Sequence, residues 1–228
     1  MAFPFKLVPL PTSKIINLFY MKPVKLLLSV ILASAMISCA PATENQNEKK
    51  ENAMNPVIEN IMARRSIRQY KPEPVKRETM DMILNCGINA PSGMNRQSWE
   101  VKVLDKPEVI SKLKAAMVSA NPNTKPENVE GCFRGAPTLV FVAADQGYDF
   151  STIDCGLLSQ NIMLSAWSLG VGSVCLGSPI RFLMESPEAL AILGFSEGYK
   201  PVICIGLGYA NESPEAKPRD VSKVKYIE

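Results

Sequence analysis

One long segment, residues 150–169, constrains the fold more than any other part of this 228-residue chain. Its sequence, FSTIDCGLLSQNIMLSAWSL, would place apolar residues on nearly every side of a helix, and it is followed by Gly170, a typical helix stop. A helix that is apolar all round lies in the centre of a protein or in an interface rather than on a surface. We therefore expect this helix in the middle of the domain or in a dimer interface.

Helices and strands are interleaved through the chain from Asn55 onward. Apolar residues at helical spacing, together with capping signals, predict helices over 56–62, 76–90, 107–120 and 186–194, the last capped by Ser186. Alternating or continuous apolar runs predict strands over 98–104, 136–145, 171–177 and 200–209. The segment 121–135 has the Asn, Pro and Gly content of a loop. This order predicts one α/β or α+β domain around a central sheet.

The first part of the chain has the plan of a signal peptide. From Met21, where we place the true start, two lysines precede an apolar run, Leu26 to Ile37, that is shorter than the ~20 residues of a membrane-spanning helix. The following Met-Ile-Ser-Cys resembles a bacterial lipobox, in which Cys39 would be lipidated and become the mature N-terminus.

Three parts of the chain follow from this assignment. Residues 1–38 are upstream residues and a lipoprotein signal peptide, 39–54 are a polar tether, and 55–228 are the folded domain. The expected location is that of an exported, membrane-anchored lipoprotein on the periplasmic or cell-surface side, held by its lipid alone.

Charge and residue content exclude several function classes. The leader holds four lysines and no acid, so the 25 basic residues of the chain leave 21 downstream against 22 acidic ones. A nearly neutral domain does not suit a nucleic acid partner, which calls for a surplus of bases. Histidine is absent, which excludes Ser-His-Asp and Cys-His catalysis and HExxH zinc sites.

The six cysteines lie at least 20 residues apart in the sequence and form no zinc-binding spacing. We therefore expect no metal site. For the five beyond the leader, Cys86, Cys132, Cys155, Cys175 and Cys204, we expect buried structural thiols, although an oxidising compartment would also allow disulfides.

Three arginines surround Ser66 in the stretch MARRSIRQYKP, residues 62–72. Basic residues at the end of a helix complement its dipole and stay solvated, which is the usual explanation of such a cluster. Guanidinium groups also bind one phosphate or a planar carbonyl edge with several donors. A second basic pair, Lys217 and Arg219, flanks a proline near the other end, and extended backbone would place both on one side.

Two further motifs lie between predicted elements. The stretch APSGMNRQSW, residues 90–99, has the Pro, Ser, Gly and Asn content of an ordinary turn, which is enough to explain its presence. It also carries Asn95 and Gln97, whose amide groups can pair with the edge of a heterocycle. Glycines in LGVGSVCLGSP, residues 169–179, do not form a Rossmann fingerprint, because the order here is helix then strand. Gly177 and Ser178 instead open a loop at a strand end, where ligands bind in such sheets.

Together these motifs resemble the FMN-dependent nitroreductase family. The resemblance rests on RRSIRQY, on APSGMNRQSW about 30 residues later, on the long apolar helix leading into SLGVGSVCLGS and on the terminal Lys-Pro-Arg, and it spans nearly all of residues 56–226. It implies an α+β fold of nitroreductase type, with a central, mainly antiparallel sheet flanked by helices. It also implies an interlocked homodimer with an FMN at each of two interface sites.

The resemblance assigns three groups of cofactor-binding residues. The FMN phosphate and the pyrimidine edge of the flavin would be held by Arg64, Arg65, Ser66, Arg68, Lys217 and Arg219. The partner subunit would contribute the loop residues Pro91, Ser92, Gly93, Asn95 and Gln97. Flavin N5 would be bordered, mainly by backbone groups, by Cys175, Leu176, Gly177 and Ser178. Ser98 stands where the family motif usually has proline, and no side chain is expected to be catalytic, because flavin N5 carries the hydride.

The implied activity is a two-step exchange. NAD(P)H or another carrier would reduce FMN and leave, and a nitroaromatic, a quinone or a similar small acceptor would then take the electrons. More specialised flavin chemistry would call for a distinctive lid, and the segment 121–135 is too short and featureless to indicate one. The alternative from another class is a non-catalytic flavin-binding or sensor lipoprotein on the cell surface that keeps the fold.

Overall fold

The computed structural model describes residues 54–228. The predicted leader, the lipidation site Cys39 and all of the tether except Met54 lie outside these residues, so the lipoprotein assignment stays a prediction. Within residues 54–228, no helix combines the length and apolar character needed to cross a membrane.

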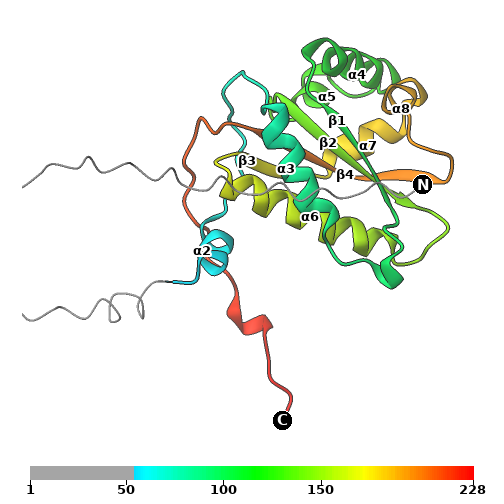
Figure 1. The fold of residues 1–228 in the computed structure, drawn as a ribbon. Coiled ribbons are helices and arrows are strands. Elements are labelled where there is room, and N and C mark those ends of the chain that lie inside the picture. Colours follow the sequence, from blue (N-terminus) through cyan, green and yellow to red (C-terminus); the bar gives the residue numbers. More distant parts are fainter. Residues whose placement is uncertain (1–53) are drawn as a thin grey trace, which may run out of the picture. The chain divides into compact units, whose positions relative to one another are not determined.

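A four-stranded sheet forms the middle of the domain (Figure 1). Its strands are β1 (Trp99–Leu104), β2 (Thr138–Asp145), β3 (Gly172–Leu176) and β4 (Tyr199–Gly208), in the order β1-β2-β4-β3. All three neighbouring pairs are antiparallel. The predicted antiparallel α+β fold is therefore confirmed, with strand bounds within two residues of those expected.

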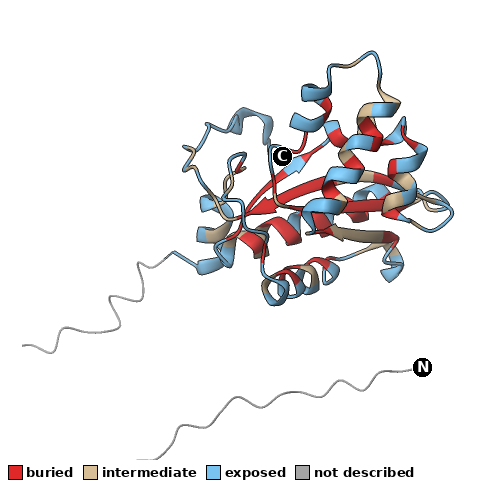
Figure 2. Ribbon diagram, turned by 90° about the horizontal axis from the view of Figure 1, so that it is seen from above, coloured by how far each residue is buried: buried red, intermediate tan, exposed pale blue. Residues whose placement is uncertain are grey.

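Helices cover both faces of the sheet (Figures 1 and 2). One face packs against α4 (Pro107–Ala120), α5 (Pro126–Gly131), α7 (Ser178–Met184) and α8 (Pro187–Leu193), and the other against α3 (Arg77–Ile88) and α6 (Ser151–Ser168). Strand β2 is buried along nearly its whole length because alternate residues enter the two cores: Leu139 and Phe141 one, Val140 and Val142 the other. Its unbroken apolar run follows from this double burial.

The long helix α6 is only partly enclosed. Cys155, Leu158 and Ile162 are buried in the core that α6 shares with α3 and the sheet. On its outer side, Ile153 and Leu157 are 59% and 41% exposed. One face of the helix therefore packs in the core, and another apolar face is exposed at the surface of this chain.

Two short helices were not expected from the sequence. The segment 121–135 contains α5, and Ser178 begins α7 instead of opening a loop, so both loop assignments were wrong. Each helix has only six or seven residues, too few to show a helical period, and each is fixed by burial of a core side chain, Val129 in α5 and Leu183 in α7. The predicted cap of α8 is confirmed: Ser186 Oγ accepts a hydrogen bond from Ala189 N at 3.2 Å.

The remaining elements lie near the chain ends and the 90–99 turn. They are α2 (Pro56–Ala63) and the short 3₁₀ turns η1 (Gly93–Asn95) and η2 (Val221–Lys223). After η2 the C-terminal residues extend away from the sheet and stay exposed (Figure 1).

Candidate functional site

The arginine segment after α2 runs beside strand β3. Ser66 forms a parallel bridge with Ser173, and the Ile67 N–H donates to the Ser173 carbonyl at 3.0 Å. The approach needs a glycine at position 172, because a Cβ there would lie 2.8 Å from Ile67 Cγ1. The arginine segment, residues 62–72, is thereby brought next to β3, which lies within the glycine-containing motif of residues 169–179.

The segment that follows β4 is hydrogen-bonded to the same arginine segment. The Lys71 N–H donates to the Tyr209 carbonyl and the Asn211 N–H to the Gln69 carbonyl, both at 2.9 Å. Glu212 adds a carboxylate that accepts hydrogen bonds from the backbone N–H groups of Arg68 and Gln69, the latter at 3.1 Å. Residues about 140 positions apart in the chain are thus held side by side.

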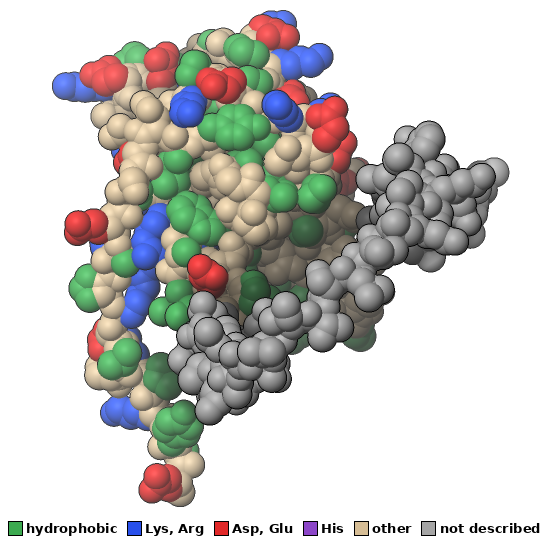
Figure 3. Space-filling model, turned by 60° about the vertical axis from the view of Figure 1, so that its left-hand side comes forward, with side chains coloured by type: hydrophobic (Ala, Val, Ile, Leu, Met, Phe, Trp, Pro, Cys, Tyr) green, Lys and Arg blue, Asp and Glu red, His purple; other side chains and the backbone are tan. Residues whose placement is uncertain are grey.

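Between these two segments lies a cavity of about 240 Å³, which we call the cationic pocket. It is lined by Arg64, Arg65, Ser66, Arg68, Pro214, Glu215, Lys217 and Arg219. All six residues predicted to hold the phosphate and the pyrimidine edge therefore meet in one cavity. Basic side chains gather on this face of the molecule beside the C-terminal segment (Figure 3).

The charges of the cationic pocket are not balanced within the described chain. In residues 54–228 the one ion pair joins Lys102 and Glu100, outside the pocket, at 3.6 Å. Arg64 Nη1 is buried without a hydrogen-bond partner. Burial, and then the neighbouring Arg219 and Arg65 guanidinium groups, lower the pKa of Arg64. A buried donor among like charges is what a bound anion would satisfy.

Of the four residues predicted to border flavin N5, Cys175 lies close enough to Arg64 for the two charges to influence each other. Cys175 is exposed rather than buried, and Cys86 is exposed as well, so the buried-thiol prediction fails for these two. Cys175 as a whole is exposed, but its thiol is partly enclosed by protein atoms; this loss of hydration raises the pKa of the thiol, and the positive charge of Arg64 partly opposes the effect. Leu176 is buried in the core, while Gly177 and Ser178 lead into α7.

The other three cysteines are buried, as predicted: Cys132, Cys155 and Cys204. Burial raises the pKa of the Cys132 and Cys155 thiols to about 12. All five cysteines of the described chain are free thiols. No group of three or more His, Cys, Asp or Glu side chains in residues 54–228 is placed to hold a metal ion.

The turn of residues 91–98, which we call the 91–98 loop, has an unusual backbone. Met94, Asn95 and Gln97 have φ values of 52°, 55° and 50°, in the left-handed region that favours glycine. Each such residue costs of order 1–3 kcal/mol, so the surrounding contacts must hold the shape. Inside the loop, Ser92 Oγ accepts from the Gln97 N–H at 3.0 Å.

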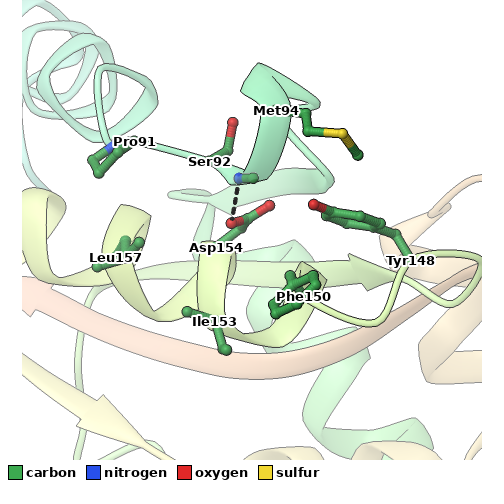
Figure 4. Close-up of a pocket in the computed structure, with 9 residues that line it drawn as sticks. Pro91, Ser92, Met94, Tyr148, Phe150, Ile153, Asp154 and Leu157 are labelled. Atoms are coloured by element: carbon green, nitrogen blue, oxygen red, sulfur yellow. Dashed lines mark hydrogen bonds between the residues drawn. The ribbon is translucent and has the colours of Figure 1, made fainter.

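Side chains from the start of α6 and the turn before it support the loop. Asp154 accepts a hydrogen bond from the Gly93 N–H at 3.0 Å (Figure 4). It accepts a second one from Ser98 Oγ at 2.6 Å. The Tyr148 hydroxyl packs against the Cα of Gly93 so closely that a Cβ there would lie 2.1 Å from its oxygen. The Arg96 guanidinium sits 4.4 Å from the centre of the Tyr148 ring.

Next to the loop lies an apolar cavity of about 500 Å³. It is lined by Pro91, Ser92, Gly93, Met94, Tyr148, Phe150, Ile153, Asp154 and Leu157. Within one chain the 91–98 loop therefore lines a different cavity from the arginines. The prediction that the loop serves the partner subunit's flavin is not tested by a single chain.

The sequence pattern alone did not predict roles for Tyr148, Asp154 and Glu212. Asp154 carried a visible signal, a lone carboxylate within an otherwise uncharged helix, where a buried charge calls for partners. Tyr148 and Glu212 lie in polar segments where nothing local marks them. Their roles arise from contacts with residues far away in the sequence.

Comparison with known proteins decides the family. The model of the family described as Nitroreductase family matches residues 61–209. The chain belongs to the nitroreductase family. A relative from Vibrio harveyi, named NADPH-flavin oxidoreductase, is 30% identical over 172 residues, which are 73% of this chain and 70% of that protein.

Solved structures agree with the family. A nitroreductase with bound FMN from Desulfitobacterium hafniense has a TM-score of 0.68 and 31% identity, covering 77% of this chain and all of that one. Another, from Bacteroides fragilis and also with bound FMN, has a TM-score of 0.69 and 26% identity, with the same coverage. The predicted family and fold are confirmed.

Proposed function

We propose that this chain is an FMN-dependent oxidoreductase that moves electrons from a reduced donor to a small acceptor by a two-step exchange. The observation that carries the proposal is the cationic pocket, in which five basic side chains face one cavity without an ion pair inside the described chain. Membership of the nitroreductase family and the FMN-bound structural relatives support the same cofactor.

The residues of the pocket fit a phosphate. The unpartnered Arg64 Nη1 supplies a buried donor, and Arg65, Lys217 and Arg219 add positive charge at the same cavity. Guanidinium groups match phosphate oxygens with parallel donors, and such charge-assisted bonds are about twice as strong as neutral ones. The half-buried Ser66 can place its hydroxyl on the same anion.

The tasks of the protein follow from this arrangement. FMN, when bound, supplies the hydride chemistry. The basic side chains would fix its anionic end and give a positive field near the pyrimidine edge, which favours the reduced cofactor. The chain between Cys175 and Ser178 would border N5 from the end of β3. Since no histidine is present, protons would come from solvent.

For the substrates, NAD(P)H is the donor that the relatives' names suggest, as in the NADPH-flavin oxidoreductase of Vibrio harveyi. The acceptor would be a nitroaromatic, a quinone or a similar small molecule. If the chain is exported, nicotinamide cofactors are scarce around it, and a membrane or protein electron carrier would take the place of NAD(P)H.

A homodimer completes the proposal. The apolar side chains Phe150, Ile153 and Leu157 at the start of α6 are between 41% and 59% exposed, and they continue the lining of the cavity beside the 91–98 loop. Exposed apolar surface of this kind is typical of an interface. We propose that a second subunit covers this surface and that the loop of one chain lies at the cationic pocket of the other.

The visible absorption spectrum of the purified domain, residues 55–228, tests the function. We expect a flavin spectrum that bleaches on anaerobic addition of NADH and returns when a nitroaromatic is added. Bound flavin that neither NADH nor a chemical electron carrier can bleach would favour the non-catalytic sensor. Absence of flavin even after incubation with FMN would contradict the proposal.

We also propose that the full chain is an exported lipoprotein anchored through Cys39. Fatty-acid labelling of the full chain, compared with a Cys39→Ser variant, tests this. Label on the wild type alone, with partition into the membrane fraction, is the expected result. Equal labelling of both chains, or none of either, would contradict it.

A further inference from the structure

The buried carboxylate of Asp154 uses both of its oxygens on one loop. The residue is 2% exposed and lies in the first turn of α6. Oδ1 accepts from the Gly93 N–H at 3.0 Å and Oδ2 from Ser98 Oγ at 2.6 Å. Because these donors lie near the two ends of the 91–98 loop, this one side chain holds the loop against α6. Figure 4 shows the bond to Gly93.

A charge in this position is not explained by packing. The neighbouring α6 residues Cys155 and Leu158 belong to the apolar core, and no cation of the described chain pairs with Asp154. The helix N-terminus favours an anion there, but a buried carboxylate still loses its hydration and depends on the two loop donors. An apolar side chain would fill the same space without this loss, so what Asp154 adds is a fixed loop shape.

The loop is of the kind that needs such a support. Met94, Asn95 and Gln97 have positive φ values, and an unsupported chain of these residues would relax to other conformations. In the shape that Asp154 holds, Asn95 and Gln97 are exposed, so their amide groups are open to a ligand.

We infer that Asp154 is a positioning residue, which holds the 91–98 loop in a preformed shape for the flavin of the neighbouring subunit. This inference rests on the proposed FMN function. It does not require Asp154 to touch the cofactor, since the carboxylate acts through Gly93 and Ser98. A loop that is already ordered loses less conformational entropy when FMN binds, and binding is tighter for that reason.

Two measurements on the full chain test the inference. The first is hydrogen exchange of the 91–98 peptide in FMN-free protein, and the second is the dissociation constant for FMN. We expect an Asp154→Ala variant to lose exchange protection in this peptide and to bind FMN roughly 10- to 100-fold more weakly, the range for hydrogen bonds to a charged group. Asp154→Asn keeps an acceptor for the Gly93 N–H and is expected to show a smaller loss of both.

A Ser159→Ala variant is the matched control. Ser159 is equally buried in α6 and donates to the Cys155 carbonyl at 2.7 Å, so its loss also removes a buried hydrogen bond from the helix. We expect it to leave the exchange of the 91–98 peptide and the affinity for FMN unchanged. Equal effects of Ser159→Ala and Asp154→Ala would show a merely structural role for Asp154 and overturn the inference.

Should Asp154→Ala fail to fold, Ser98→Ala removes one of the two bonds and leaves the carboxylate in place. The expected result is then a several-fold weaker FMN affinity with faster exchange of the loop. Wild-type exchange and affinity in this variant would overturn the inference. A wild-type chain that binds no FMN would instead overturn the proposed function, and the exchange measurement would still decide whether Asp154 holds the loop.

Discussion

The cationic pocket and the 91–98 loop differ in how their charges are balanced. In the pocket, Arg64 has a buried donor without an acceptor, and further cations crowd around it. At the loop, the single buried charge of Asp154 is matched by two hydrogen bonds. Within the described chain, the pocket therefore keeps a buried donor without an acceptor, whereas both oxygens of the buried carboxylate at the loop have hydrogen-bond donors.

This difference separates two ways of preparing a binding site. Crowded cations repel one another and destabilise the unliganded fold, so a site of this kind releases free energy when an anion arrives. A loop that is hydrogen-bonded in advance contributes through lower entropy loss instead. Variants in the pocket are therefore expected to change affinity without lowering stability, and variants at the loop to change both.

The largest expected effect is that of Arg64→Ala. Loss of a charge-assisted contact with the phosphate weakens FMN binding roughly 10- to 100-fold. Thermal unfolding of the FMN-free protein should stay the same or shift upward, because like-charge repulsion from Arg219 and Arg65 is relieved. FMN titration and a melting curve check both expectations. Lys112→Ala, an exposed lysine on α4, is the control and should change neither. A lower melting temperature with unchanged affinity would make Arg64 structural.

Next is Gly93→Ala at the loop. The added Cβ meets the Tyr148 hydroxyl at 2.1 Å and must displace that ring, which we expect to lower the free energy of unfolding by about 1–3 kcal/mol and to weaken FMN binding as well. Urea unfolding and FMN titration measure the two effects.

The double variant Gly93→Ala with Tyr148→Phe sharpens this test. Removing the hydroxyl relieves the shortest contact, so part of the lost stability should return, although the ring carbon at 3.1 Å remains tight. Additive losses in the double variant would show that Tyr148 does not limit position 93.

A smaller effect on FMN affinity is expected at Glu212, which holds the two segments beside the cationic pocket together. Glu212→Ala removes the acceptor for the Arg68 and Gln69 N–H groups and should cost about 1–3 kcal/mol of stability, with only a few-fold loss of FMN affinity, because Glu212 does not line the pocket. Urea unfolding and FMN titration check this. A loss of affinity as large as that of Arg64→Ala would mean that Glu212 positions the arginines directly.

The smallest effect concerns Cys175. Because partial enclosure of the thiol raises its pKa, the alkylation rate of the FMN-free protein should rise with pH, with a midpoint above that of an ordinary cysteine. Arg64→Gln removes the charge that opposes this shift, so the midpoint should move higher still. Mass spectrometry of the Cys175 peptide across a pH series checks it. A midpoint that does not move would place Arg64 too far away to affect the thiol.

Prediction from the sequence succeeded where the signal is local. Strand β2 and helix α4 follow from apolar patterns and a proline at the helix start, and both were predicted almost to the residue. The short helices α5 and α7 were missed, because their stability comes from Val129 and Leu183 entering a core built by other parts of the chain.

For the candidate site, the amino-acid sequence by itself determined which residues are present: the basic cluster around Ser66, the Lys217 and Arg219 pair, and the turn of residues 90–99. Only the tertiary structure decided that the two basic groups share one cavity, in which no ion pair forms although Glu215 also lines it, and that Asp154 supports the turn. The physical reason is that residue type sets charge and hydrogen-bonding capacity locally, whereas burial and pairing depend on segments that meet only when the sheet has formed.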